Sequence, residues 1–411
     1  MIHTSFWRPR VYPYLGDGVP TEIDRVQDLS TTVTLNREKI REVGRDGIVD
    51  WRKRIPSVRV SLRQFEYGNI EFWRKVTNAE DNDNDIVLND FKTAMIDIVG
   101  YKTDDDGTFT GCVWYPKLRT SSFNINIGDP QASVERSFEF AGEDENILQG
   151  TSQYFNYQRF VAVGGAPEAI AIDDPAPVAD PDLSGQYLFR VVRYTPSTKT
   201  TTELVYSTSV STTIYYTFSA PSTLSCATTA DDIIRVYYAA ATFNTNSQSA
   251  VFTNNDGDPG TLVADSCSIY LYDSSNHYVY RLQSVSIDVS FDRADYYEIG
   301  DEDIIQRGIN DKTVRITLGR MIEAYTIEEV LRNKSADYGK LNTRKYEDDS
   351  TLRIYIYENA DKTTFKMGYK FTGLSPVSFD TGTAVNTYAN RNAVVEGENC
   401  LISALSASID A

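Results

Sequence analysis

Few residues in this chain are suited to catalysis, and histidine, the most common general base of enzymes, is nearly absent. The two histidines, His3 and His277, lie far apart in the sequence, and no Ser-His-Asp or Cys-His set can be assembled around them. No G-x-x-x-x-G-K motif occurs, and no G-x-G-x-x-G motif follows an expected strand, so nucleotide binding has no support. Carboxylates are abundant, but nothing singles out two of them as a glycosidase pair. We therefore expect no enzymatic activity and no cofactor.

Two acidic stretches resemble calcium loops without completing one. The tract DNDND at residues 81–85 begins like such a loop, but Ile86 stands where the loop needs glycine and Lys92 where it needs glutamate. The stretch NNDGD at residues 254–258 is more typical of a turn. No CxxC pair occurs, so we expect no zinc site and reduced thiols, with a disulfide between Cys226 and Cys267 as the alternative. The cysteines are Cys112, Cys226, Cys267 and Cys400.

The composition describes a soluble, acidic, strand-forming protein. The net charge of −18 over 411 residues argues against a protein that grips nucleic acid by neutralising phosphates. The 27 tyrosines, together with many threonines and valines, favour strands over helices. No apolar run is long enough to span a membrane, and the first residues lack the apolar core of a signal peptide, so we expect no membrane association and no secretion by that route.

One stretch occurs twice and organises the rest of the chain. Residues 25–62 align without a gap to residues 281–318 at an offset of 256 residues, with about eleven identities in 38 positions, where chance supplies about two. We interpret this as a duplicated domain. The identical residues of the first copy are Arg25, Gln27, Ser30, Val33, Arg37, Glu42, Gly44, Ile48, Val58, Arg59 and Leu62.

Each copy opens with a strand in which apolar and polar residues alternate. In the first copy Leu29, Val33 and Leu35 point to one face, and in the second copy Val285, Ile287, Val289 and Phe291 do so. We expect the apolar face to pack on a core and the other face to meet water. Arg59 and Arg315 lie on the polar faces of the next strands, where a cross-strand ion pair and a contact with another subunit are the alternatives. The expected polar-face residues are Ser30, Thr32, Thr34, Arg59, Ser286, Asp288, Ser290 and Arg315.

A long polar loop follows the first strand in both copies, although a strand hairpin needs only two loop residues. The loop is mostly basic in the first copy and acidic in the second. The two alternatives are a solvated hairpin tip and a loop that reaches a neighbouring subunit and pairs by charge. The charged residues are Arg41, Arg45, Arg52, Lys53 and Arg54 in the first copy and Glu298, Asp301, Glu302 and Asp303 in the second.

The rest of the pattern predicts a mainly β protein with several domains. Short helices are expected at residues 69–76 and 326–334. Short strands between the copies are typical of an immunoglobulin-like sandwich. The fold class is therefore two similar β-sandwich or barrel domains, each with a short flanking helix, and an immunoglobulin-like domain between them. The expected divisions are an N-terminal arm at 1–24, a first repeat domain at 25–155, a linker at 156–184, the immunoglobulin-like domain at 185–280 and a second repeat domain at 281–411.

These features together resemble the tail tube proteins of tailed bacteriophages and related injection machines. The resemblance covers residues 25–150 and 281–411, and it rests on strand order, loop position and the strand ending RSFEFAGED. It implies a structural virion protein whose inner strands join those of other copies into a barrel ring, and whose rings stack through the long loop. For a duplicated member it implies a trimer with pseudo-hexameric symmetry, and an immunoglobulin-like domain on the outside.

The resemblance also implies partners and a location. The partners are further copies of the chain, the tape measure, tail terminator and baseplate proteins, and double-stranded DNA that passes through the lumen during ejection without sequence-specific binding. The protein would be assembled in the host cytoplasm and reside in the virion tail. Two alternatives are a baseplate or tail-completion ring protein of the same fold, and a carbohydrate-binding or carbohydrate-active β-sandwich protein.

Overall fold

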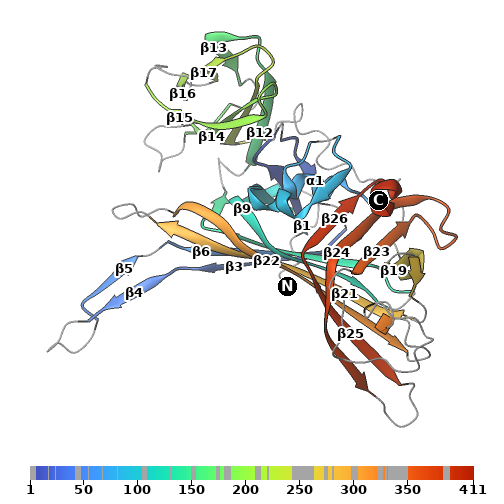
Figure 1. The fold of residues 1–411 in the computed structure, drawn as a ribbon. Helices are drawn as coiled ribbons and strands as arrows, with labels where there is room; N and C mark the ends of the chain where they lie inside the picture. Colours follow the sequence, from blue (N-terminus) through green and yellow to red (C-terminus); the bar gives the residue numbers. More distant parts are fainter. Residues whose placement is uncertain are drawn as a thin grey trace.

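The computed structural model of the chain is built mainly from β-strands, which confirms the expected fold class (Figure 1). Large connected sheets form most of the molecule, and a smaller sheet, drawn in green, stands apart from them. The structure describes residues 6–16, 18–23, 25–41, 48–53, 55–66, 68–80, 82–103, 109–128, 131–149, 154–172, 176–179, 187–208, 214–219, 222–242, 263–272, 276–279, 282–297, 304–321, 327–328, 331, 350–382 and 389–411.

An inner sheet runs through both repeats without a break. Its antiparallel strands pair in the order β3, β6, β10, β9, β21, β22, β25 and β24. Alternation gives the sheet an apolar and a polar face, as in β6, where Val58 and Val60 are buried and Arg59 is exposed. The bounds are β3 (Val26–Thr34), β6 (Ser57–Phe65), β9 (Phe109–Ile127), β10 (Glu135–Gly142), β21 (Leu282–Tyr297), β22 (Ile304–Met321), β24 (Phe365–Gly382) and β25 (Asn390–Gly397).

Two outer sheets pack on the apolar face of the inner sheet, and the main core lies between these layers. The first outer sheet consists of β2, β1, β8, the first half of β9, and β11. The second consists of β20, β19, β23, the first half of β24, then β26 and β7. The bounds are β1 (Phe6–Pro13), β2 (Thr21–Glu22), β7 (Asp85–Val87), β8 (Ile96–Thr103), β11 (Asn146–Leu148), β19 (Cys267–Tyr272), β20 (Asn276–Tyr278), β23 (Ser350–Tyr357) and β26 (Asn399–Ser403).

The two repeats use the same strand pairings, including one strand each that passes from the outer to the inner layer. β9 pairs with β8 in its first half and with β10 in its second, and β24 does the same with β23 and β25. Each strand bends at a residue with positive φ, Lys117 (φ 51°) in β9 and Gly373 (φ 67°) in β24. These two residues are also 256 positions apart, so the bend belongs to the repeat. Glycine adopts this conformation without strain, whereas Lys117 needs local support.

Short helices fill the ends of the sandwich. The helix α1 (Glu71–Thr77) begins where Asn69 accepts a hydrogen bond from the backbone N–H of Glu71, and it ends at Asn78 in the left-handed conformation. Its Trp73 is fully buried and makes edge-to-face contacts with aromatic rings of both layers. The expected first helix at 69–76 is therefore present. Of the second, at 326–334, the structure describes Ile327 and Glu328, which are helical, and Leu331, whose backbone N–H donates to the carbonyl oxygen of Ile327 at 2.9 Å. Further helices in the described part of the chain are η1 (Leu88–Lys92), η5 (Ala264–Ser266) and α4 (Ser406–Asp410).

A middle domain, formed by residues 154–242, has its own sheet and core. Its strands follow the order β12, β18, β14, β15, β16, β17 and β13, with a parallel pairing between β15 and β16. Leu188, Leu224, Val236 and other apolar residues form its core. The bounds are β12 (Tyr154–Val161), β13 (Gly165–Ala171), β14 (Leu188–Thr195), β15 (Thr200–Tyr206), β16 (Tyr215–Ser219), β17 (Thr223–Thr228) and β18 (Ile233–Ala240).

The strand pairings place three segments differently from the expected divisions. The expected N-terminal arm contributes β1, which pairs with β8, so it belongs to the first outer sheet rather than to a free or docked arm. The expected linker at 156–184 contains β13 and most of β12, which pair within the middle domain. The strand β19, expected in the middle domain, pairs with β23 of the second repeat. Prolines within β1 and β13 interrupt the pattern that marks a strand, whereas β19 was expected as a strand and only its partner β23, distant in the sequence, could not be predicted.

One hairpin projects away from the body of the molecule (Figure 1). It consists of β4 (Arg37–Ile40) and β5 (Asp50–Lys53), and its side chains from Arg37 to Arg41 are exposed.

The described residues hold no group of side chains arranged for a metal ion, and no helix there is long and apolar enough to cross a membrane. All four cysteines are free and buried, so the alternative disulfide between Cys226 and Cys267 is wrong.

Candidate functional site

The two repeats meet along an internal seam that joins strands in both layers. In the inner layer, β9 of the first repeat pairs with β21 of the second, with Phe123 opposite Val289 and Ile125 opposite Ile287. The side chains of Val289 and Ile287 are at most 1% exposed. In the outer layer, β7 of the first repeat pairs with β26 of the second. Each repeat therefore completes sheets of the other.

Arg293 locks the inner layer of the internal seam. Its Nε donates a hydrogen bond to the carbonyl oxygen of Thr120 at 3.0 Å, and its Nη2 donates to that of Phe91 at 2.9 Å. The adjacent Phe291 stacks on Phe91 with ring centroids 5.3 Å apart. Hydrogen bonds from a charged donor are stronger than neutral ones, so the guanidinium fixes the position of the second repeat against the first.

A buried carboxylate links the repeats between the layers. Glu66 and Arg136 of the first repeat form a fully buried ion pair at 2.9 Å. Tyr369 of the second repeat donates to the same carboxylate at 3.0 Å. Burial and the nearby Glu66 raise the pKa of Tyr369 well above its usual value, so the hydroxyl remains a donor. Breaking the internal seam would leave Glu66 with one partner fewer in an apolar surrounding.

The acidic tract that begins like a calcium loop takes part in the outer layer of the internal seam. The Asp85 carboxylate accepts hydrogen bonds from the hydroxyls of Ser403 and Ser408, which belong to the second repeat. The carbonyl oxygen of Asn84 accepts from the backbone N–H of Ala404 at 3.0 Å. The described part of this tract is therefore used in packing between repeats.

The inner sheet ends in two open edges, one at each end. The outer edge of β3 and the outer edge of the second half of β24 have no partner strand among the residues that the structure describes. The equivalents of these edges, β21 and the second half of β9, pair with each other at the internal seam. Val33 is 38% exposed and Leu35 is 61% exposed, whereas their equivalents Val289 and Phe291 are 1% and 4% exposed. The same apolar pattern is thus covered in one repeat and uncovered in the other.

The expected polar-face residues do lie together on one side of the inner sheet. Thr32 lies opposite Arg59, and Asp288 lies opposite both Arg315 and Asn124. A groove of about 410 Å³ on this face is lined by Asp28, Arg63, Glu139, Asp288 and neighbouring side chains. The acidic side chains of the face include Asp28, Glu135, Glu139, Asp288, Asp292, Asp311, Asp380 and Glu396, and the basic ones include Arg59, Arg63, Arg119 and Arg315.

The expected stacking loops lie partly outside the described residues. Arg41 and Arg52 are exposed on the projecting hairpin, and the backbone of Lys53 lies in β5. Four exposed apolar side chains accompany them, of which Trp51 is the largest and is covered on one face by the ammonium of Lys39. Arg45, Arg54, Glu298, Asp301, Glu302 and Asp303 lie outside the described residues.

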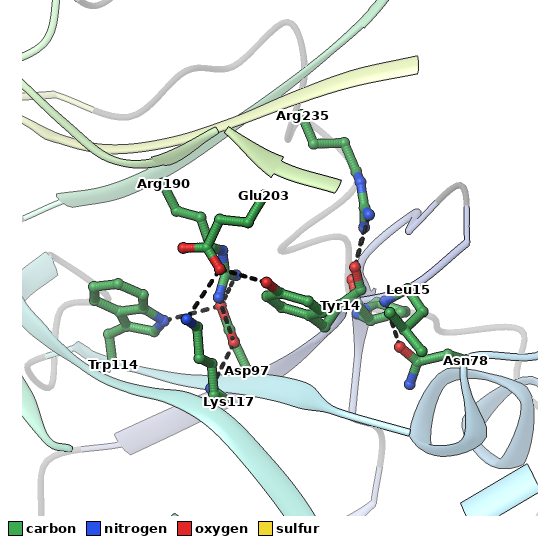
Figure 2. Close-up of polar contacts among 10 residues, drawn as sticks. Tyr14, Leu15, Asn78, Asp97, Trp114, Lys117, Arg190, Glu203 and Arg235 are labelled. Carbon is green, nitrogen blue, oxygen red and sulfur yellow. Dashed lines mark hydrogen bonds and ion pairs between the residues drawn. The ribbon is translucent and has the colours of Figure 1, made fainter. Parts of the chain in front are cut away.

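The middle domain is fixed to the outer sheet of the first repeat by a buried polar junction (Figure 2). Arg190 of the middle domain forms a buried ion pair with Asp97 of β8, and this carboxylate also accepts from Trp114 at 3.2 Å and from the backbone N–H of Lys117 at 2.9 Å. Asp97 therefore also supports the strained bend of β9. Burial would lower the pKa of Arg190, but Asp97 and neighbouring groups raise it further, so the arginine stays charged.

Two further contacts flank that ion pair. Glu203 accepts a hydrogen bond from Tyr14 and pairs with the ammonium of Lys117 at 2.9 Å. Burial would raise the pKa of Glu203, but these two partners lower it below its usual value. Arg235 donates to the carbonyl oxygens of Pro13 and Tyr14 at 2.8 and 2.7 Å. The middle domain thus lies on the side of the sandwich opposite to the polar face.

Sequence reasoning missed the charged residues that fix these contacts, although a signal for them exists. Arg136 shares its side of β10 with Phe138 and Phe140, and a charged residue in such a row predicts a buried partner. Asp97 likewise shares its side of β8 with the buried Val99 and Tyr101. Their partners, Glu66 and Arg190, are distant in the sequence, so the two ion pairs could not be predicted from the sequence alone.

No protein-family model matches the sequence, and no curated protein sequence matches it. Among solved structures, the chain is similar to a component of the anti-feeding prophage baseplate, with 14% identity over 36% of this chain and 97% of the other and a TM-score of 0.26. It is also similar to a component of the sheath-tube complex of the extracellular contractile injection system PVC in its extended state, with 14% identity over 38% of this chain and 97% of the other and a TM-score of 0.27. At these TM-scores the likeness does not identify what this chain does.

Proposed function

We propose that this chain is a tail tube subunit, a structural virion protein whose trimeric, pseudo-hexameric rings stack into a tube that conducts double-stranded DNA during ejection. The observation that carries the proposal is the pair of open edges on the inner sheet. They repeat the two strands that already pair at the internal seam, so one copy can join the next by the contact it makes within itself. Such a head-to-tail contact generates a ring when its rotation closes.

The exposed face of β3 supports this proposal energetically. An unpaired strand edge next to exposed apolar side chains promotes uncontrolled association unless a partner covers it. Val33 and Leu35 are exposed while their equivalents in the second repeat are buried. A closed ring of copies covers both edges and leaves none open. Three copies supply six repeats, which is the origin of the pseudo-hexameric symmetry.

The polar face of the inner sheet fits the wall of a DNA channel. The middle domain is anchored on the opposite side, so the polar face becomes the inside of the ring and the middle domain its outside. Carboxylates outnumber arginines on the described part of this face, and hydroxyl and amide groups separate them. Such a surface repels the phosphate backbone and offers few cationic anchors, which favours passage over binding.

The remaining contacts of the assembly follow from the same arrangement. The projecting hairpin, with Trp51, Arg41 and Arg52, is proposed to reach the next ring and to meet the acidic loop that contains Glu298 and Asp301. Tape measure, tail terminator and baseplate proteins are the proposed partners along the tube and at its ends. The middle domain is proposed as an immunoglobulin-like domain that decorates the tube. No enzymatic step is proposed.

Electron microscopy of the purified protein tests this function. Long tubes built from stacked rings, with one outward knob for each chain, are the expected result. Isolated rings that never stack would instead favour the baseplate or tail-completion alternative. A protein that stays monomeric at high concentration and hydrolyses or retains glycans in a screen would contradict the proposal and favour the carbohydrate alternative.

A further inference from the structure

We propose that β24 of one copy pairs with β3 of the next in one defined antiparallel register, with Phe379 opposite Val33, and that Arg37 locks this contact as Arg293 locks the internal seam. The inference rests on the proposed ring and specifies its contact surface. The occupant of the exposed face of β3 is therefore a second copy of this chain.

The first step is to match β24 with β9. Phe123 pairs with Phe138 of β10, and Phe379 pairs with Ala393 of β25. These partners are themselves equivalent, because β10 and β25 occupy the same register against β6 and β22. An irregularity in the pairing falls between Pro376 and Ser378 of β24 and at the corresponding point of the first repeat. Phe379 is therefore the equivalent of Phe123.

The second step transfers the register of the internal seam. Phe123 lies opposite Val289 there, and Val289 is the equivalent of Val33, so Phe379 lies opposite Val33 in the contact between copies. The same transfer places Asp380 opposite Thr32. A shift by one residue would turn every side chain of β24 to the other face of the sheet, so the apolar pattern excludes it.

The exposure of the two edges fits this register. Phe379 is only half-buried, with the guanidinium of Arg391 5.2 Å from its ring centre, whereas its equivalent Phe123 is 2% exposed under the second repeat. Val33 is 38% exposed. Bringing these two apolar side chains together removes both from water, as at the internal seam. Proline at position 376 lacks a backbone donor, which an edge strand tolerates.

Arg37 occupies the position of the seam arginine. It follows Val33 by four residues, as Arg293 follows Val289, and its side chain is exposed. The first acceptor of Arg293 is the carbonyl oxygen of Thr120, whose equivalent is the carbonyl oxygen of Pro376. Proline lacks a backbone N–H but has a carbonyl oxygen, so the acceptor is present at position 376. The guanidinium of Arg37 is thus assigned to the carbonyl oxygen of Pro376 in the neighbouring copy.

Disulfide trapping tests the register. The double variants Val33→Cys/Phe379→Cys and Thr32→Cys/Asp380→Cys place cysteines directly opposite, and strand pairs of both kinds lie within the Cα range of disulfides. The native thiols give little background because they are buried, and burial raises the pKa of Cys112, Cys226 and Cys267 to about 12. We expect covalent trimers on a denaturing gel from both variants. The control Val33→Cys/Thr381→Cys, shifted by two residues, should cross-link much less.

The outcomes separate the register from the ring itself. If rings form but the shifted control cross-links and the two direct pairs do not, the proposed register is wrong. The proposed function would remain, because the rings still form. A protein that never associates overturns both. For Arg37, we expect Arg37→Ala to raise the concentration needed for half-assembly about tenfold or more. Arg159→Ala, at an exposed arginine of the middle domain, is the matched control, and equal effects of the two substitutions would remove Arg37 from the contact.

Discussion

Asp97 and Arg190 depend on each other at the junction between the first repeat and the middle domain. Both side chains are at most 2% exposed. Two charges at this depth are tolerable only as a pair, since burying either one alone costs several kcal/mol. The same carboxylate supports the bend of β9 through the backbone of Lys117. Asp97 therefore contributes both to the attachment of the middle domain and to the bend at which β9 passes between layers.

We predict that Asp97→Ala destabilises the protein by about 3–5 kcal/mol, because it leaves Arg190 buried without its partner. The double variant Asp97→Ala/Arg190→Met removes both charges and should recover part of that loss. Urea unfolding with intrinsic fluorescence measures both changes. An Asp97→Ala protein with an unaltered midpoint would show that the ion pair does not hold the junction.

We predict that the protein loses stability against unfolding in alkali, because two of its tyrosines are buried. Burial raises the pKa of both Tyr12 and Tyr101 above the usual value of 10.0. In the unfolded chain they ionise near that value, so the folded state holds more protons above it and its stability falls as pH rises. The loss begins near pH 10 and continues through the raised folded-state pKa values. The urea midpoint at about pH 8 and at about pH 11 measures the loss.

Tyr101→Phe is the matched variant for that prediction. It removes one of the two hydroxyls, which lie 2.7 Å apart, and the fall in midpoint between the two pH values should be smaller than in the unaltered protein. A fall of the same size in both proteins would assign the alkaline loss to other groups, such as the buried thiols.

At the level of elements, β3 and β21 show what a sequence pattern determines and what it leaves open. The alternation of Val33 and Leu35 with polar residues predicted the strand correctly, as it did for Val289 and Phe291. It did not show that, among the residues that the structure describes, β21 has a partner on both sides and β3 on one side only. That difference depends on residues brought to the edge from elsewhere in the chain.

The matched pair Val33→Asp and Val289→Asp tests this difference. Val289 is 1% exposed, so an aspartate there places an unpaired charge in the core and should prevent folding. Val33 is 38% exposed, so its aspartate variant should fold as a monomer and fail to form rings. Circular dichroism and size-exclusion chromatography distinguish the two. Normal rings from Val33→Asp would contradict the proposed role of β3.

At the level of the whole molecule, the repeat was visible in the sequence but its limits were not. The identities between residues 25–62 and 281–318 mark two strands of the inner sheet in each repeat, yet the equivalence extends to β1 and β19, which share no obvious pattern. β1 also packs on the middle domain through Tyr12, which lies in a buried cluster with Phe155 and Tyr237, so its side chains serve a contact that differs from those of β19. The charged residues of the middle-domain junction were equally hidden, since pairing across the fold leaves no local spacing.

The charge of the proposed lumen gives a prediction for the assembled tube. The variant Glu135→Lys/Glu139→Lys/Glu396→Lys reverses acidic positions of the polar face away from the contact between copies and should make assembled rings retain double-stranded DNA at low salt, with release as salt increases. The unaltered protein should retain none. An electrophoretic mobility assay over a salt series measures this. Equal retention by both proteins would show that the polar face does not line the channel.

The number of chains in the smallest closed assembly tests the account most directly. The proposed pseudo-hexameric ring holds six repeats, and two repeats in each chain then give three chains in every ring. Native mass spectrometry of assembled rings should therefore give a mass of three chains, or a multiple of three when rings stack. A closed assembly of six chains in one ring, or of two, would contradict the proposal that the internal seam is repeated between copies.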